Sequence, residues 1–226
     1  TNARGRLATL ADVTELTESS LGSVPMFRGK AEQKLLERGL DPSRLPPGQY
    51  LTEKWPVLHA GDVPQTDLAT WDFTVFGEVE EPLRLGWDEF TALPRTETTQ
   101  DIHCVTRWSR FDAQFAGVHW RELAKLVRPK PSARFVVAHA EQGFTSNVPL
   151  EYLEDENALL ATHADGEPLT PEHGWPLRLV IPRKYFWKSA KWLRGIELLA
   201  TDQPGFWERY GYHNEADYWK EERYSF

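Results

Sequence analysis

The chain has 226 residues, of which 40% are hydrophobic and 27% are charged, and its formal net charge is −8. This length can bury the core of one large domain or two small ones, and the acidic balance argues against a nucleic-acid partner, which would need a broad basic face. No apolar run reaches the roughly 20 residues that cross a bilayer, and a single cysteine excludes an internal disulfide framework and a multi-cysteine metal site.

The first part of the chain is polar and rich in turns. Residues 1–20 lack the charged and then apolar pattern of a secretory signal, so we expect a cytoplasmic protein, with a processed periplasmic form as the alternative. An amphipathic stretch at 30–40 predicts a short helix, and the proline- and glycine-rich residues 41–50 predict extended chain. We therefore predict an N-terminal extension over 1–45 and a folded domain over 46–226.

Strand and helix patterns follow each other from residue 71 onward. The alternating apolar residues of 71–79 predict a strand, and 86–94 predict a short helix that ends at a proline. Residues 119–129 predict a second helix that is also followed by proline. Its apolar face is expected to consist of Leu123, Leu126 and Val127.

The second half of the chain adds strands and an aromatic tail. Short apolar, β-branched runs predict strands at 133–140, 176–182 and 195–201. The tail, 204–226, is so rich in Trp and Tyr that we expect it to fold back over the domain. Because strands and helices mix without the regular alternation of a parallel doubly wound sheet, the predicted fold class is α+β.

Basic residues are concentrated in one segment of this acidic chain. Between His173 and Arg194 there are six Lys and Arg side chains and no Asp or Glu. Such a segment suggests a local anion site, and the alternative is a solvated basic strand edge. The six residues are Arg178, Arg183, Lys184, Lys188, Lys191 and Arg194.

Cys104 is the single cysteine, in the stretch TTQDIHCVTRWSRF. A lone cysteine is most often a small buried hydrophobe. Here His103 precedes it and Arg107 and Arg110 follow, and these neighbours favour a thiolate. A nucleophile, a redox thiol and a soft metal ligand are the three open roles. No histidine lies in a cysteine-hydrolase signature, and no second cysteine could resolve a disulfide. A metal on one thiolate needs its other ligands from elsewhere, such as an organic cofactor with sulfur ligands and a phosphate that occupies a basic pocket.

Four short motifs, in this order, resemble those of the sulfite oxidase-like molybdopterin oxidoreductases. They are WPVLHAGDVP (55–64), CVTRWS (104–109), HGWPLRLVIP (173–182) and KSAKWL (188–193). The second motif is similar to the bacterial CV-x-x-WS pattern, and the third to HGFPVR-x-VVP. The resemblance extends from about residue 45 to the C-terminus, and the four motifs together are far more specific than any one of them.

The resemblance implies a role for each motif. It makes Cys104 the protein ligand of molybdenum and places His59 beside the cofactor. His173 and Arg178 would bind the pterin, where a planar guanidinium offers several donors. The cofactor phosphate would meet Ser189, Ala190 and Lys191.

The substrate side of the site departs from the sulfite oxidase pattern. Those enzymes carry consecutive arginines soon after the cysteine, C-AGNRR, whereas this chain has CVTRWSR, which leaves Arg107 as the candidate and Arg110 as the second. The stretch GFWERYGYH resembles the one that carries an active-site tyrosine, with Tyr212 the better candidate and Tyr210 the second. We expect Arg107, His103 and Tyr212 to form the substrate pocket.

The resemblance implies an enzyme with a sulfite oxidase molybdopterin-binding fold of mixed sheets with peripheral helices. It would bind one mononuclear molybdenum–molybdopterin and transfer an oxygen atom to or from a small sulfur oxyanion or an S-oxide. A separate electron-transfer protein would exchange electrons with it, and we expect a monomer. The alternatives are a non-catalytic molybdopterin-binding protein and a cofactor-free globular protein with a buried cysteine.

Overall fold

The computed structural model describes residues 29–226. The chain divides into two compact units, Thr1–Pro42 and Ser43–Phe226. In the first, helix α1 (Lys30–Glu37) confirms the predicted short helix, with Leu35 buried. The prediction about an export signal, and most of the predicted extension 1–45, lie outside the described residues. None of the helices in the described part of the chain has the length and apolar character of a membrane span.

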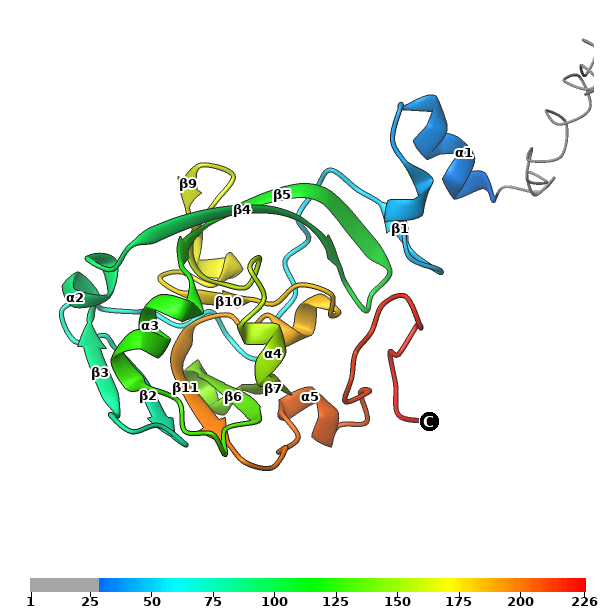
Figure 1. The fold of residues 1–226 in the computed structure, drawn as a ribbon. Helices are drawn as coiled ribbons and strands as arrows, with labels where there is room; N and C mark the ends of the chain where they lie inside the picture. Colours follow the sequence, from blue (N-terminus) through cyan, green and yellow to red (C-terminus); the bar gives the residue numbers. More distant parts are fainter. Residues whose placement is uncertain (1–28) are drawn as a thin grey trace, which may run out of the picture. The chain divides into compact units, whose positions relative to one another are not determined.

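The second unit is built on two sheets (Figure 1). Within Ser43–Phe226, all of it described, the larger sheet has six strands and is organised by the long strand β5, which pairs with β1, β4 and β8. Its strands are β1 (Tyr50–Leu51), β4 (Arg95–His103), β5 (Trp108–Val118), β8 (Leu159–Ala164), β9 (Glu167–Pro168) and β10 (Arg178–Val180). The antiparallel pair β4 and β5 forms a long curved ladder in Figure 1, and Cys104 lies at its turn.

The smaller sheet holds five strands in the order β3-β2-β11-β6-β7, all from the described second unit. They are β2 (Asp72–Gly77), β3 (Leu83–Gly86), β6 (Phe135–Ala140), β7 (Thr145–Pro149) and β11 (Leu193–Leu199). Strand β11 pairs parallel to β2 and antiparallel to β6. The mixed strand directions and the few helices confirm the predicted α+β class.

Four short α-helices accompany the sheets in the second unit: α2 (Trp87–Thr91), α3 (Trp120–Val127), α4 (Leu150–Leu153) and α5 (Phe206–Arg209). The backbone N–H of Arg121 donates to His119 Nδ1, which caps α3. Leu123 and Val127 are fully buried on this helix, but Leu126 is 45% exposed. The predicted apolar face was therefore wrong at Leu126.

The predicted strands are present, and the ladder at Cys104 is additional. Strands β2, β6, β10 and β11 occupy the segments predicted at 71–79, 133–140, 176–182 and 195–201, with at least one end of each strand shifted. The β4 segment RTETTQDIH shows little apolar alternation, because only Thr98, Ile102 and His103 of this strand are buried. Its partner β5, rather than its own pattern, holds it in the sheet.

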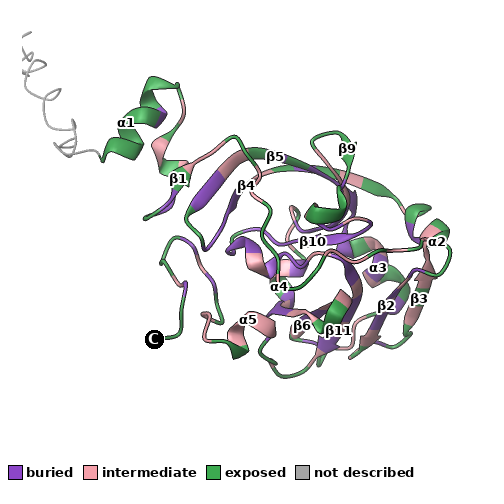
Figure 2. Ribbon diagram, turned by 180° about the vertical axis from the view of Figure 1, so that it is seen from behind, coloured by how far each residue is buried: buried purple, intermediate pink, exposed green. Residues whose placement is uncertain are grey.

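The apolar residues form two clusters. One contains Phe73, Phe90 and Trp120 and packs against the five-stranded sheet. The other surrounds the turn at Cys104 and includes Trp108 and Phe115. Figure 2 shows the buried residues running through β6, β10 and β11.

The C-terminal tail folds back as predicted. Ala216 is fully buried, its carbonyl accepts from the backbone N–H of Tyr185 at 2.8 Å, and Tyr218 belongs to the cluster around Cys104. The tail thereby contributes to the walls around the cysteine rather than extending into solvent.

Candidate active site

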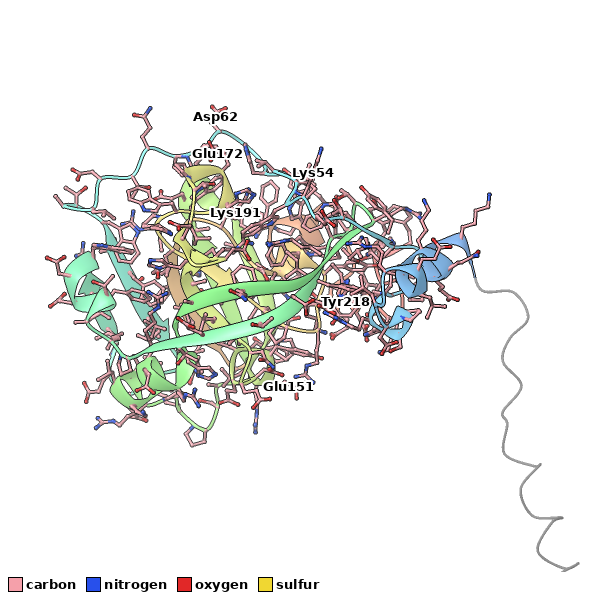
Figure 3. The ribbon with its side chains drawn as sticks, turned by 90° about the horizontal axis from the view of Figure 1, so that it is seen from above. Lys54, Asp62, Glu151, Glu172, Lys191 and Tyr218 are labelled. Atoms are coloured by element: carbon pink, nitrogen blue, oxygen red, sulfur yellow. The ribbon has the colours of Figure 1, made fainter. Side chains whose placement is uncertain are left out.

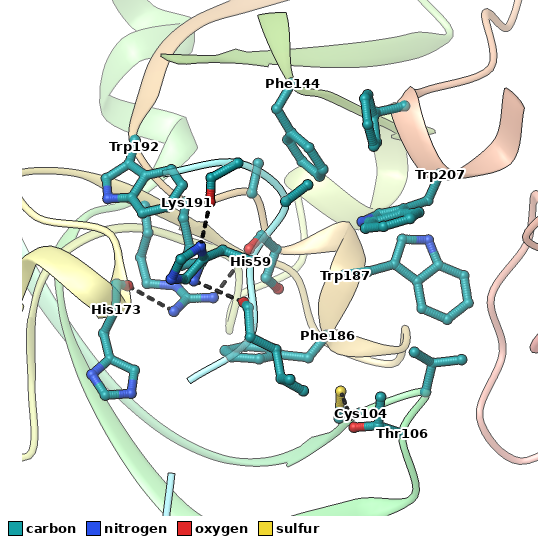
Figure 4. Close-up of a pocket in the computed structure, with 18 of the residues that line it drawn as sticks. His59, Cys104, Thr106, Phe144, His173, Phe186, Trp187, Lys191, Trp192 and Trp207 are labelled. Atoms are coloured by element: carbon teal, nitrogen blue, oxygen red, sulfur yellow. Dashed lines mark hydrogen bonds between the residues drawn. The ribbon is translucent and has the colours of Figure 1, made fainter. Parts of the chain in front are cut away.

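A cavity of about 510 Å³ lies where the four motifs meet. Its lining comes from segments that are distant in the sequence, within 55–61, 104–108, 141–144, 173–178, 186–192 and 206–212. Eight of the nine predicted site residues line it: His59, Cys104, His173, Arg178, Ser189, Ala190, Lys191 and Tyr212. Figure 4 shows two ends, with Cys104 and Thr106 beside Phe186 and Trp187 at one, and His173 and Lys191 at the other.

Arg107 does not line the cavity, so its predicted place in the substrate pocket is wrong. It stands at the tip of the β4–β5 hairpin with a positive φ of 77° and an exposed side chain. Its Nη1 atom lies 3.5 Å from the position that a Cβ on Gly48 would occupy, and Gly48 belongs to the segment just before strand β1. The left-handed backbone at the tip points this side chain out of the cavity.

His103 and Arg110 have structural partners instead of cavity positions. The His103 ring is buried, with Nδ1 2.8 Å from Ser109 Oγ and its centroid 4.3 Å from that of Tyr218. Burial lowers the pKa of His103 to about 4, so this imidazole is neutral at physiological pH. Arg110 is paired with Asp165 at 2.7 Å. The predicted contribution of His103 to the substrate pocket is therefore wrong.

The Cys104 thiol is buried in the cavity wall. The backbone N–H of Cys104 donates to Trp108 O at 2.9 Å, which closes the hairpin turn, and Thr106 Oγ1 donates to Sγ at 3.2 Å. Burial raises the pKa of this thiol, while the Thr106 hydrogen bonds and the charge of Arg223 act against that rise. A metal that bonded to the sulfur would replace its proton and supply the missing positive charge.

Arg178 is a buried cation at the other end of the cavity. It is 2% exposed, and its Nη1 and Nη2 donate to the carbonyls of His173 and Ser189 at 2.9 and 3.0 Å. Its guanidinium carbon lies 4.4 Å from the centre of the Phe186 ring, and Nε has no partner among the described residues. No carboxylate of the described chain pairs with it, and burial lowers its pKa to about 9. A buried unpaired cation is costly, so this site is suited to an anionic or strongly accepting ligand.

Lys191 adds a second cation at the same end. Its Nζ donates to the carbonyls of Leu58 and Glu172, each at 2.8 Å, and Figure 3 shows Lys191 close to Glu172. Burial, and then the charge of Arg178, lower the pKa of Lys191 to about 7. An anion in this place would restore the charged form.

Gly174 allows these two cations to share the site. It has a φ of +108°, and a Cβ there would lie 3.1 Å from the Cβ atoms of both Arg178 and Lys191. Only glycine combines this backbone conformation with so close an approach.

The histidines of the motifs flank the same end. His173 stacks on Trp55 with ring centroids 4.1 Å apart, its Nε2 lies 3.2 Å from Trp55 O, and its Nδ1 lies 2.9 Å from Thr170 Oγ1. Because a carbonyl only accepts, Nε2 carries the proton and Nδ1 accepts from the threonine. His59 is exposed at the rim, with Nδ1 2.8 Å from Gly61 O.

The six basic residues predicted as one anion site separate into two groups. Arg178 and Lys191 line the cavity. The others have acidic partners: Arg183 with Asp155, Lys184 with Glu215, Lys188 with Glu208, and Arg194 with Asp72 and Glu141. Ser189 was expected to meet the cofactor phosphate, but its polar groups already have partners within the protein. Its backbone N–H donates to Phe186 O, and its Oγ accepts from Ile181 N.

Aromatic side chains form the end of the cavity nearest the cysteine, and most were not singled out from the sequence. Trp187 and Tyr212 lie with ring centroids 5.1 Å apart, and Trp207 and Tyr212 5.0 Å apart. The aromatic density of the tail was the available signal. Nine Trp, Phe and Tyr residues of the described chain line the cavity: Trp55, Trp108, Phe144, Phe186, Trp187, Trp192, Phe206, Trp207 and Tyr212.

Among residues 29–226 no three His, Cys, Asp or Glu side chains are grouped to hold a metal. A metal at Cys104 would thus take its remaining ligands from a cofactor. The chemistry fits the molybdenum cofactor, with a soft sulfur at one end of the cavity and, at the other, two cations and an unpartnered guanidinium N–H for a phosphorylated pterin.

The comparison with protein families agrees with this donor set. The model for the oxidoreductase molybdopterin binding domain matches residues 60–207. The chain belongs to the molybdopterin-binding oxidoreductase family. The matched residues include Cys104, His173, Arg178 and Lys191, while His59 and Tyr212 lie just outside them.

Similar proteins cover most of the chain. The oxidoreductase YuiH of Bacillus subtilis is 48% identical over 202 residues, which are 88% of this chain and 99% of that protein. The methionine-sulfoxide reductase catalytic subunit MsrP of Campylobacter jejuni is 29% identical over 62% of this chain and 52% of its own length. The sulfane dehydrogenase SoxCD of Paracoccus pantotrophus has the same fold, with a TM-score of 0.60 and 23% identity over 68% of this chain and 43% of that one. This chain is therefore an oxidoreductase that binds the molybdenum cofactor, which excludes the cofactor-free alternative.

Proposed function

We propose that this oxidoreductase reduces a small neutral S-oxide by removing its oxygen atom at molybdenum. The observation that carries the proposal is that the buried Cys104 thiol and the unpaired buried Arg178 share one cavity. Cys104 would ligate molybdenum, and Arg178, Lys191 and His173 would hold the pterin and its phosphate. A cofactor held in this way leaves the aromatic end beside Cys104 for the substrate.

The charges around the cavity favour a neutral substrate over a sulfur oxyanion. The Lys and Arg residues that line it, within the described chain, are Arg178 and Lys191, both at the end assigned to the cofactor. Arg107 points away, and Arg110 is paired with Asp165. An oxyanion at the aromatic end would therefore lose its hydration without gaining a cation. An S-oxide places its apolar groups against the indole rings and needs one hydrogen-bond donor for its oxygen.

Tyr212 can supply that donor. It lines the cavity, and its ring packs between Trp187 and Trp207. Burial raises the pKa of Tyr212, and the negative charge of an ionised Tyr224 or Cys104 raises it further. The phenol thus stays protonated across the neutral range, so it can donate to the S–O oxygen and stabilise the charge that develops there.

Reduction of an S-oxide also requires a source of electrons and a site that is shielded from bulk water. When bound, the molybdenum cofactor would supply a centre that gives two electrons to the S-oxide and accepts its oxygen atom. Conversion of an S-oxide into a sulfide consumes two electrons and two protons and releases the oxygen as water. We propose that a separate electron-transfer protein delivers the electrons and that the aromatic wall excludes bulk water from the reacting atoms. Among the relatives, MsrP is named as a methionine-sulfoxide reductase subunit, in agreement with this direction.

A substrate screen on molybdenum-loaded protein tests the proposed direction. With a reduced dye as electron donor, we expect turnover of small dialkyl and alkyl aryl sulfoxides. With an oxidised dye as acceptor, we expect little or no oxidation of sulfite. Oxidation of sulfite faster than reduction of every sulfoxide tried would contradict the neutral-substrate assignment.

Replacement of the thiol tests the ligand assignment separately. In Cys104→Ser we expect loss of activity and an altered Mo(V) paramagnetic resonance signal, because an oxygen donor is harder than sulfur. The far-ultraviolet circular dichroism should stay unchanged, because the side chains are almost the same size. A wild-type Mo(V) signal in this variant would show that Cys104 is not a ligand.

A further inference from the structure

The hairpin turn that carries Cys104 has little internal support. Within the four residues Cys104–Arg107, the backbone N–H of Arg107 donates to Cys104 O at 2.9 Å, and Arg107 has a positive φ of 77°. A ligand presented from such a turn must be held in place, because metal–sulfur bonds need a defined direction and distance.

Gln49 and Arg223 donate hydrogen bonds to two of the carbonyls of this turn. Gln49 Nε2 donates to Cys104 O at 3.0 Å, and Arg223 Nη1 donates to Val105 O at 2.6 Å. Both residues are buried, each 6% exposed. A charged donor in a buried bond of this length is among the stronger hydrogen bonds that a protein makes.

These two residues come from opposite ends of the domain. Gln49 directly precedes strand β1, where the backbone N–H of Tyr50 donates to Arg107 O at 2.8 Å. Arg223 lies near the end of the tail, its guanidinium carbon 4.8 Å from the centre of the Tyr185 ring. The turn is thus fixed by an N-terminal arm and a C-terminal arm that are remote from it in sequence.

The other side-chain hydrogen bond of Arg223 is longer, from Nη2 to Pro47 O at 3.5 Å. Neither Gln49 nor Arg223 lines the cavity, and the nearest carboxylate oxygen to Arg223 is Glu221 Oε1 at 3.7 Å on a half-exposed side chain. A buried arginine with so weak an acidic partner is unfavourable unless its hydrogen bonds are needed.

We propose that Gln49 and Arg223 are positioning residues that hold the turn Cys104–Arg107 so that the Cys104 sulfur faces the metal. This inference rests on the proposed role of Cys104 as the molybdenum ligand. It assigns to the tail a function in metal binding, in addition to covering the domain.

Thiol labelling of the full chain tests the hold on the turn, because Cys104 is the single cysteine and every label reports on it. We compare the labelling rates of cofactor-free protein after extrapolation to full ionisation of the thiol, because loss of the Arg223 charge also lowers the thiolate fraction at a fixed pH. On that scale Arg223→Gln should react with a thiol reagent about tenfold faster than wild type, the factor expected from the loss of one charged buried hydrogen bond. Arg223→Lys keeps the charge and a donor and should fall between the two.

A second measurement reports on the metal itself. In molybdenum-loaded protein we expect Arg223→Gln to shift the Mo(V) g values, with Arg223→Lys closer to wild type, because the sulfur orientation changes. Gln49→Met removes the donor to Cys104 O without a large change in volume, and it should also accelerate labelling. It provides the test if Arg223→Gln does not fold.

Val127→Ala serves as the control for general loss of stability, because Val127 is fully buried in the other core cluster. Labelling rates and g values of the Gln49 and Arg223 variants equal to wild type would overturn the proposal, and so would equal acceleration in Val127→Ala. A wild-type Mo(V) signal in Cys104→Ser would instead overturn the ligand assignment, since labelling of cofactor-free protein reports on the turn whether or not the sulfur binds metal.

Discussion

Arg178 and Lys191 are two cations that the fold places together without a carboxylate. Their positions oppose their charge, since burial lowers the pKa of Arg178 to about 9 and that of Lys191 to about 7. Glu172 favours the charge of Lys191, but its own side chain is in solvent. A bound anion would raise both pKa values, so ligand binding and protonation are linked here.

We predict that sulfate, a stand-in for the cofactor phosphate that does not titrate near neutrality, binds cofactor-free protein more weakly as the pH rises. Between about pH 7 and about pH 9 Lys191 loses its proton while Arg178 keeps its own, so the affinity should fall by up to about tenfold per pH unit. Titration calorimetry in buffers of different ionisation enthalpy should show proton uptake. Lys191→Met is the control and should bind weakly at every pH. An affinity in wild type that does not change with pH would contradict the prediction.

The same pKa shift affects folding in the opposite direction. The folded-state pKa of Lys191 is about 7 and its unfolded value is 10.5. Between these values the unfolded chain binds more protons, so this group makes cofactor-free protein more stable as the pH rises through that window. Below about pH 7 the cost of burying the charged amine is present in full.

At the scale of single residues, sequence motifs located the cofactor end of the site and failed at the substrate end. His173 and Arg178, and Ser189 and Lys191, are close in sequence, so their meeting depends on local turns that a motif records. Arg107 was predicted in the pocket because it follows Cys104, as arginines do in the sulfite oxidases. At the hairpin tip it has a positive φ and an exposed side chain that does not line the cavity. Trp187 meets Tyr212 only through the tertiary fold, which no local pattern specifies.

At the scale of elements, one buried ion pair fastens the aromatic wall. Lys188, in the 3-10 turn Phe186–Lys188, has Nζ 2.6 Å from Glu208 Oε1 of α5, and both side chains are at most 3% exposed. The amine also donates to Asn147 O and Oδ1 of β7 at 2.8 and 3.0 Å, and Trp187 Nε1 donates to Glu208 Oε1 at 2.9 Å. Three elements and the cavity tryptophan therefore depend on one pair.

We predict that Glu208→Ala lowers the free energy of unfolding by about 3–5 kcal/mol, because it leaves the Lys188 charge buried without its carboxylate. The double variant Lys188→Met with Glu208→Leu should recover most of that loss, since an apolar pair of similar volume avoids the desolvation cost. Urea denaturation followed by circular dichroism measures both. If the loss of unfolding free energy in the double variant equalled the sum of the losses in Lys188→Met alone and Glu208→Leu alone, the two charges would not depend on each other.

The sequence predicted strands well where the strand has its own apolar pattern, and poorly where pairing with a neighbouring strand holds a polar segment in the sheet. The apolar run of β6 and the alternation of β2 carry their own signal. The polar strand β4 is held in the sheet by eight residue pairs with β5, and this pairing is not evident from the sequence of β4 itself. The site consequently depends on a ladder that only tertiary structure makes visible.

At the scale of the whole molecule, a chain with a negative net charge contains a cavity lined by two cations. The chain has a formal net charge of −8, yet its buried cavity presents Arg178 and Lys191. The negative surroundings repel free anions at long range, and the cavity attracts them at short range. Such a site selects a ligand that also gains apolar and metal–sulfur contacts, as a pterin with a dithiolene does.

We predict that the cofactor reverses the effect of Arg178 on stability. In cofactor-free protein Arg178→Met should unfold at the same temperature as wild type or higher, because it removes a buried unpaired charge whose lowered pKa corresponds to a cost of up to about 5 kcal/mol, partly offset by lost hydrogen bonds. In a host that makes the cofactor, wild type should gain stability by ligand binding, whereas Arg178→Met should retain little molybdenum and gain little. Melting temperature and molybdenum content, measured on both proteins from both hosts, check this. A cofactor-free variant clearly less stable than wild type would mean that Arg178 supports the fold itself, and full molybdenum content would remove it from the cofactor site.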